Sequence, residues 1–161
     1  MSSSAFKGFD KAQLLSDILG MISRNVQEST GRGRATAESA VHEEARAEDD
    51  RDTRAIEESY VAHGQALRVG ELEIDLAALR SLPLDSFAQD RPLVAGALVE
   101  LEDEDGERKI LFLVPRSGGM VVKNQGLTIQ LVTPASPLGA AMMGHVVDEE
   151  IEVPAKGGFR T

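Results

Sequence analysis

Acidic side chains gather in one short stretch of this sequence. Between Glu43 and Glu58, eight Asp or Glu residues stand against three Arg, a local net charge of −5 within 16 residues. Carboxylates at this density repel nucleic acid and attract a metal-rich centre. A second interpretation stays open, in which the acids are a solvated helix end, favoured by the dipole where the next helix begins.

The other residue types that carry chemistry form no recognisable site. The histidines at 42, 63 and 145 lack the spacing of a metal set, and no HExxH pattern is present. No local motif supports Ser-His-Asp catalysis. With zero Cys there is neither a disulfide framework nor a thiolate nucleophile, which fits a reducing compartment.

Composition indicates a folded protein and excludes several classes of partner. Apolar residues make up 42% of the 161 residues and charged residues 27%, a balance that builds a core. A net charge of −10 disfavours broad, unaided DNA binding, and 4% aromatic residues disfavour base-stacking RNA readers. Neither a leader sequence nor an apolar run of ~20 residues is evident, so we expect a cytoplasmic protein without membrane contact.

The first half of the sequence predicts two helices that fold back on one another. From Asp10, a plausible N-cap, to about Arg80 there is no proline. Two apolar lines have helical spacing, and the second has heptad steps. Their members are Leu14, Ile18, Ile22 and Val26, with Leu15 and Leu19 beside them, and then Ile56, Tyr60, His63, Leu67 and Ile74.

A chain reversal at residues 48–52 would bring these two lines together. In an antiparallel hairpin, facing residues have a constant sum of positions, and a sum near 101 places Ile22 opposite Leu79. The same register places Gly31 opposite Gly70, where we predict a bend or a frayed segment because glycine weakens both helices. We therefore predict an antiparallel coiled-coil hairpin over residues 1–85.

After Pro83 the pattern changes to short β-branched or apolar segments. Glu104-Asp105-Gly106 predicts a hairpin turn, and Ser136 as N-cap before Pro137 predicts a short helix that stops at Gly144. The predicted strands are Val94–Leu101, Lys109–Val114, Leu127–Val132 and Glu150–Val153. Residues 86–161 are thus predicted to form a mostly antiparallel sheet with one short helix, and the whole chain an α+β protein.

This half carries a family resemblance. Residues 132–144 (VTPASPLGAAMMG) followed by 146–153 (VVDEEIEV), and the segment 96–103 (GALVELED), resemble conserved stretches of the bacterial Gre transcript-cleavage factors. Together they span most of residues 92–154. The resemblance implies an FKBP-like C-terminal domain behind an N-terminal antiparallel coiled coil, although the aromatic side chains of a prolyl isomerase pocket are scarce.

The resemblance also implies a function. Gre factors bind RNA polymerase and insert the coiled-coil tip into its secondary channel, where tip carboxylates help to hold an active-site Mg2+ and stimulate cleavage of backtracked RNA. The chain is then an accessory factor, not an enzyme, with no cofactor of its own, and we expect a monomer. For Mg2+, Asp50 matches the first acid of the family pattern, and Asp49 and Asp52 are placed to substitute for the second. The candidate residues for the other roles are Arg24, Arg32 and Arg34 for the RNA 3′ end, and Met142 and Met143 for polymerase docking.

Two alternatives remain open. Thr53 stands where the family pattern has its second acidic residue, which favours a channel-binding regulator or inhibitor that does not cleave. The other alternative is an interaction protein whose coiled coil pairs with a second copy of itself.

Overall fold

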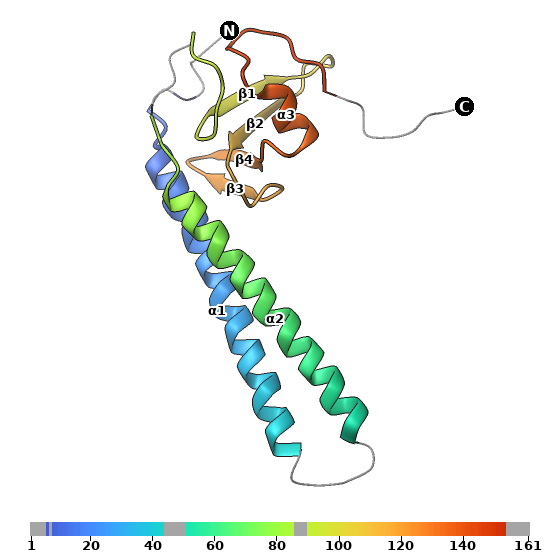
Figure 1. The fold of residues 1–161 in the computed structure, drawn as a ribbon. Coiled ribbons are helices and arrows are strands. Elements are labelled where there is room, and N and C mark those ends of the chain that lie inside the picture. Colours follow the sequence, from blue (N-terminus) through green and yellow to red (C-terminus); the bar gives the residue numbers. More distant parts are fainter. Residues whose placement is uncertain (1–5, 7, 44–50, 86–89, 154–161) are drawn as a thin grey trace, which may run out of the picture. The chain divides into compact units, whose positions relative to one another are not determined.

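The computed structural model describes residues 6, 8–43, 51–85 and 90–153, and its fold is α+β (Figure 1). Two long helices precede a four-stranded sheet and a short helix, which confirms the predicted class. No helix in this part of the chain is long and apolar enough to cross a membrane. The elements are α1 (Lys11–Glu43), α2 (Arg51–Arg80), β1 (Leu98–Glu102), β2 (Arg108–Leu113), β3 (Val121–Asn124), β4 (Leu127–Val132) and α3 (Pro137–Met142).

The described residues divide into two compact units. One unit is Asp17–Ala77, which holds most of both long helices. The other contains the described residues up to Ser16 and those from Ala78 onward, so the base of each long helix belongs with the sheet. The predicted division between residues 85 and 86 stays a prediction.

Helix α1 begins where the sequence predicts, because Asp10 caps it. The Asp10 Oδ1 atom accepts hydrogen bonds from the backbone N–H groups of Ala12 (2.9 Å) and Gln13 (3.0 Å). These are donors that a helix start otherwise leaves without a partner. The predicted apolar face is buried at Leu14, Leu15, Ile18 and Ile22.

Both long helices continue through their glycines. α1 runs unbroken past Gly31 and α2 past Gly70, so the predicted frayed segment at that level is wrong. A Cβ atom at either glycine would meet nothing within 4 Å. The cost of ~1 kcal/mol for one glycine is therefore outweighed by the hydrogen bonding of the residues around it.

Helix α2 buries a different line of residues from the one predicted. Ile56, Tyr60, Leu67 and Ile74 are all exposed, so their predicted place in a buried seam is wrong. The line that is buried or half-buried has strict steps of three and four, and we call it the inner line: Ala55, Glu58, Ala62, Gln65, Val69, Leu72, Leu76 and Leu79. Both lines have heptad spacing, and the inner line contains the three buried leucines of α2, Leu72, Leu76 and Leu79.

Two polar residues, Glu58 and Gln65, stand in the inner line, and Gln65 provides a stability test. The Oε1 atom of Gln65 is buried and has no hydrogen-bond partner among the described residues. Since a buried acceptor without a partner costs ~1–3 kcal/mol, we expect Gln65→Leu to raise the thermal midpoint by roughly 2–4 °C.

The exposed Gln27 of α1 supplies the control for this measurement. Gln27→Leu should leave the midpoint of a thermal melt unchanged within about 1 °C. A lower midpoint for Gln65→Leu than for the parent chain would mean that the amide of Gln65 has a partner in solution, and the expectation would be wrong.

The sheet is mixed, with strand order β1-β2-β4-β3. β1 pairs with β2 and β3 with β4 in antiparallel fashion, while β2 and β4 are parallel. The predicted sheet is corrected in two places. No strand forms over Glu150–Val153, and β3, which was not predicted, occupies an edge.

The β1–β2 hairpin turns where the sequence predicts. Asp103 Oδ1 accepts hydrogen bonds from the backbone N–H groups of Asp105 (3.1 Å) and Glu107 (2.8 Å), and Gly106 has a φ of 78°. Aspartate side chains favour such turns, and glycine adopts a positive φ without strain. This confirms the turn at 104–106.

Helix α3 covers the core of the sheet-containing unit. Ser136 caps it, Pro137 occupies its first turn, and Gly144 follows its end with a φ of 82°, as predicted. The buried cluster under the helix consists of Leu93, Ala97, Leu111, Leu113, Val132 and Met142. The helix therefore closes the apolar side of β2 and β4.

Candidate functional site

The predicted metal site lies almost wholly outside the described residues. Asp49 and Asp50 fall between the end of α1 and the start of α2, where the structure describes nothing. Asp52 is the second residue of α2, and its side chain also lies outside the description. In the parts of the chain that are described, no three His, Asp or Glu side chains gather to hold a metal ion. Metal binding by the three aspartates stays a prediction.

The arginines predicted to contact RNA all belong to α1. Arg24 is exposed on the part of the helix whose side chains are described. Arg32 and Arg34 continue the same helix, with side chains outside the described set. Whether they form one basic face is untested, and RNA contact stays a prediction for all three.

The two methionines predicted for docking differ in burial. Met142 is only 2% exposed and belongs to the core cluster under α3, so the expectation that it is an exposed docking residue is wrong. Met143 is half-buried and packs against that cluster. Sequence spacing could not separate the two roles, because an apolar residue at helical spacing suits a core as well as a surface.

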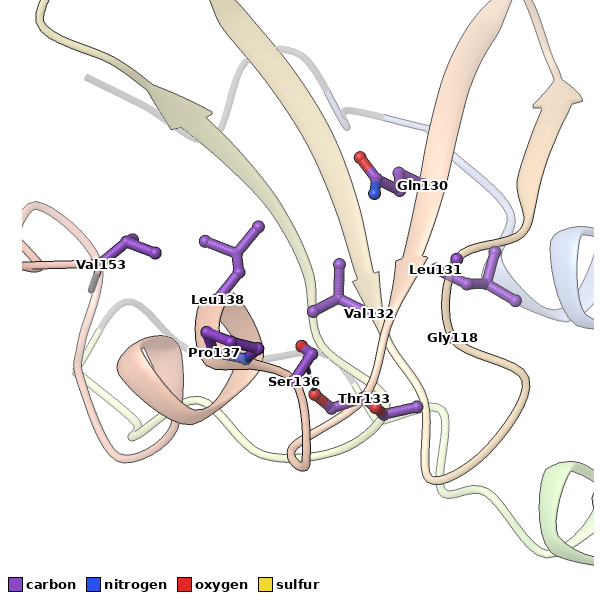
Figure 2. A pocket seen from close by; sticks show the side chains of 10 residues that line it. Gly118, Gln130, Leu131, Val132, Thr133, Ser136, Pro137, Leu138 and Val153 are labelled. Atoms are coloured by element: carbon purple, nitrogen blue, oxygen red, sulfur yellow. Dashed lines mark hydrogen bonds between the residues drawn. The ribbon is translucent and has the colours of Figure 1, made fainter. Parts of the chain in front are cut away.

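One cavity of the sheet-containing unit lies between β4 and α3. It has a volume of about 610 Å3 and is lined by the end of β4, the start of α3, two glycines of the β2–β3 loop and Val153. Figure 2 shows Val132 of β4 and Leu138 of α3 among the side chains at the pocket. None of the ten lining residues is ionisable or aromatic, so the pocket offers apolar binding and no acid or base.

The Ser136 hydroxyl group at this pocket makes two hydrogen bonds within the fold. Ser136 Oγ donates to the carbonyl oxygen of Thr133 (2.8 Å) and accepts from the backbone N–H of Gly139 (3.0 Å). With no histidine or lysine in the lining to activate it, Ser136 cannot act as a nucleophile here. Its role is to cap α3.

A lysine that sequence reasoning missed joins the base of α1 to the loop before β1. Lys11 Nζ donates to the backbone carbonyls of Asp85 (3.0 Å) and Gly96 (2.9 Å). Burial of the ammonium group lowers the pKa of Lys11, and the carboxylate of Asp85 partly opposes this. No sequence signal marks such a contact, because backbone carbonyls of any residue can accept it.

The β3–β4 turn makes a second connection to the same end of α1. Gln125 and Gly126 both have positive φ, as in a two-residue hairpin turn. The Gln125 amide accepts from the backbone N–H of Asp10 (3.1 Å) and donates to its carbonyl (3.0 Å). The polar pair before a glycine, between two apolar segments, is the signal that could have identified β3.

A carboxylate organises the loop after α3. Glu149 Oε2 accepts from the backbone N–H of Val146 (3.1 Å) and lies 2.9 Å from Nδ1 of His145. These contacts, the backbone hydrogen bond first, lower the pKa of Glu149. Both side chains are substantially exposed, so their contribution is modest and sensitive to salt.

This carboxylate predicts a pH dependence. Because its pKa is depressed in the folded protein, the stability it adds is present above the unfolded value of about 4.3 and is lost as the pH falls through the folded value. We expect Glu149→Gln to lower the thermal midpoint at pH ~7 by roughly 1–2 °C and to lower it by less at pH ~3. An equal loss in melts at both pH values would contradict this.

Comparison with known proteins gives limited similarity. No protein-family model matches the chain, and no curated protein matches it. One solved structure that resembles it is described as the transcription factor Gfh1, with 20% identity, a TM-score of 0.37, and coverage of 87% of this chain and 86% of that chain. Another is GreA factor homolog 1 (Gfh1) of Thermus thermophilus, with 20% identity, a TM-score of 0.37, and coverage of 86% of each chain. At this level of similarity, neither likeness bears on what the chain does.

Proposed function

We propose that this protein is a Gre-like transcription factor that binds RNA polymerase and inserts its acidic segment into the secondary channel of the enzyme, where it stimulates cleavage of backtracked RNA. The observation that carries the proposal is the place of the acids in the chain. Glu48, Asp49 and Asp50 stand between α1, a helix of 33 residues, and α2, a helix of 30 residues, and Asp52 is the second residue of α2. The Gre-like sequence of residues 132–144 supports the same family.

The helices are long enough for such a role. At ~1.5 Å per residue, α1 extends about 50 Å and α2 about 45 Å. The proposal pairs them as an antiparallel coiled coil, and the heptad spacing of the inner line of α2 is the pattern that such pairing requires. Carboxylates at the turn would then reach a site remote from the unit that contains the sheet.

The carboxylates suit the proposed site chemically. Mg2+ prefers hard oxygen ligands and usually takes one or two carboxylates besides water and phosphate. When bound in a two-metal site, this ion binds and activates an attacking water. This chain would contribute carboxylate ligands, from Asp50 first and from Asp49 and Asp52 beside it. The polymerase would supply the other groups of the active site.

The sheet-containing unit, which the proposal treats as FKBP-like, would dock on the polymerase. Met142 cannot take part in that contact, because it is buried under α3. Docking must therefore use exposed residues of this unit, and the apolar pocket between β4 and α3 is a surface of suitable character. Because docking and metal binding would use different parts of the chain, each can be tested separately.

The test uses stalled, backtracked elongation complexes. With Mg2+ and the parent chain, short 3′ RNA fragments should be released, and Asp50→Asn should lower the cleavage rate at least ~100-fold because a charged ligand is lost. Glu57→Gln is the matched control, since it removes an exposed acid of α2 outside the predicted site and should leave cleavage unchanged. Binding to polymerase, measured in parallel, should be the same for all three chains.

Thr53 favours a second candidate function. An acid at that position belongs to the family pattern, and its replacement by threonine removes one expected ligand. Polymerase binding without RNA fragments would support a regulator that occupies the channel without cleavage. Absence of binding would overturn both proposals.

A further inference from the structure

Helix α2 carries a second apolar line on the side away from the inner line. We call it the outer line, and it consists of four large side chains with steps of four, seven and seven. Their exposed fractions are 54% for Ile56, 73% for Tyr60, 59% for Leu67 and 57% for Ile74. The whole line lies within the unit Asp17–Ala77.

The outer line is larger than scattered surface residues would be. Four such side chains, each more than half exposed, together present on the order of 500 Å2 along one side of α2, with His63 and Gly70 between them. The inner line already fills the buried side of α2, so the outer line has no structural task in the described chain.

The spacing of the outer line indicates the shape of a partner surface that could cover it. A straight α-helix drifts by ~20° per heptad against a repeat of seven. A flat surface would therefore lose contact with the outer line after two heptads, whereas a second helix can supercoil and follow it. A helical partner is thus favoured over a sheet face or a membrane surface.

The charges beside the outer line specify the partner further. With Ile56 in a d position and Tyr60, Leu67 and Ile74 in a positions, the flanking e and g positions hold Glu57, Glu71 and Glu73, with Arg80 beyond the end of the line. Glu71 lies 3.8 Å from Arg68 of the same helix, so Glu57 and Glu73 are the principal charges offered to a partner. A second copy of α2 in antiparallel orientation would bring Glu57 against Glu71, and a parallel copy would offer no attraction. Lysine or arginine in the flanks of a partner helix would pair with Glu57 and Glu73 and compete with Arg68 for Glu71.

We propose that the outer line binds an amphipathic α-helix of another protein, one with a heptad apolar face flanked by lysine and arginine. This proposal does not depend on the proposed function, because it concerns a helix side and not the acidic segment at residues 48–52. It can hold whether or not the chain acts on RNA polymerase.

Two synthetic peptides of about four heptads test the proposal. Both carry leucine at a and d, and they differ only at e and g, where one has lysine and the other glutamate. Binding to the full chain is measured by fluorescence anisotropy of labelled peptide. We expect the lysine peptide to bind at least tenfold more tightly than the glutamate peptide at ~0.1 M salt, and the difference to shrink as salt rises.

Substitutions on α2 locate the contact. Leu67→Ser and Ile74→Ser should each weaken the lysine peptide about tenfold, while their exposure should leave the melting profile intact. Val61→Ser is the matched control, because Val61 is 50% exposed on the same helix but lies ~100° around it from Tyr60. Its affinity should equal that of the parent chain.

Three results would overturn the proposal. The first is equal affinity for the two peptides, which would remove the role of the flanking acids. The second is an equal loss of affinity in Val61→Ser and Leu67→Ser, which would place the contact elsewhere. The third is a dimer of the parent chain in sedimentation velocity that Leu67→Ser abolishes, since the outer line would then pair with a second copy.

Discussion

Gly139→Ala should destabilise the sheet-containing unit by about 3 kcal/mol and lower its thermal midpoint by ~6–12 °C. Gly139 lies in the first turn of α3, where a Cβ atom would overlap the carbonyl oxygen of Thr133 and approach its carbonyl carbon to 2.7 Å. Ser136 Oγ, 3.0 Å from the same position, holds both partners in place through the helix cap. Because backbone and cap are fixed together, the new methyl group cannot be accommodated by a side-chain rotation.

The control is the same substitution at a position with free space. Gly20 lies within α1, and a Cβ atom there would meet nothing within 4 Å. Gly20→Ala should keep or slightly raise the midpoint, because alanine favours a helix by ~1 kcal/mol over glycine. Both variants are compared with the parent chain in circular dichroism melts. A Gly139→Ala midpoint within about 2 °C of the parent chain would contradict the close approach of Gly139 to the backbone of Thr133.

Gly96→Ala should have an effect of similar size, for two reasons that add. The φ of Gly96 is 96°, which alanine adopts only with strain, and a Cβ atom would overlap the carbonyl oxygen of Pro83. The carbonyl of Gly96 also accepts the hydrogen bond from Lys11. We expect a loss of about 3 kcal/mol and faster amide hydrogen exchange in the first turn of α1.

Gly106→Ala separates the two causes. Gly106 also has a positive φ, 78°, but a Cβ atom there has nothing within 4 Å. Its alanine variant should lose only ~1 kcal/mol from strain and leave exchange at the base of α1 unchanged. If Gly96→Ala and Gly106→Ala lost equal free energy of unfolding, the contact with Pro83 would not contribute to the effect of Gly96→Ala.

Features fixed by neighbouring residues could be predicted from the sequence. The caps by Asp10 and Ser136, the turn at 104–106 and the strand Leu127–Val132 depend on side chains and backbone groups a few residues apart. Features that depend on contacts between distant segments could not be predicted from the sequence. The parallel pairing of β2 with β4 depends on a partner that no local pattern reveals. The edge strand β3 was missed although its partner β4 is adjacent in the sequence, because the turn signal at Gln125 and Gly126 was not recognised.

Helix α2 illustrates the same limit within one element. It has two lines of heptad spacing, and a helical period alone cannot say which line is buried. Ile56 and Tyr60 were predicted for the seam because they are large and apolar, whereas the inner line includes the half-buried Ala62 and Gln65. Small residues allow close approach along a helix, so size was a poor guide to burial here.

The candidate site was predictable only as a concentration of charge. The acids at 48–52 can be read from composition, but their geometry lies outside the described residues. Lys11 could not be predicted at all, since the groups it binds are carbonyls 74 and 85 residues away. Its contribution arises entirely from the fold.

The link between Asp10 and Gln125 has a consequence for biosynthesis. The two residues are 115 positions apart, so the first turn of α1 leaves the ribosome long before its hydrogen-bonding partner has been translated. The base of this helix can reach its final surroundings only when most of the polypeptide has emerged. During that interval the nascent chain exposes leucines that the finished protein conceals, and this is the period in which a chaperone would find it.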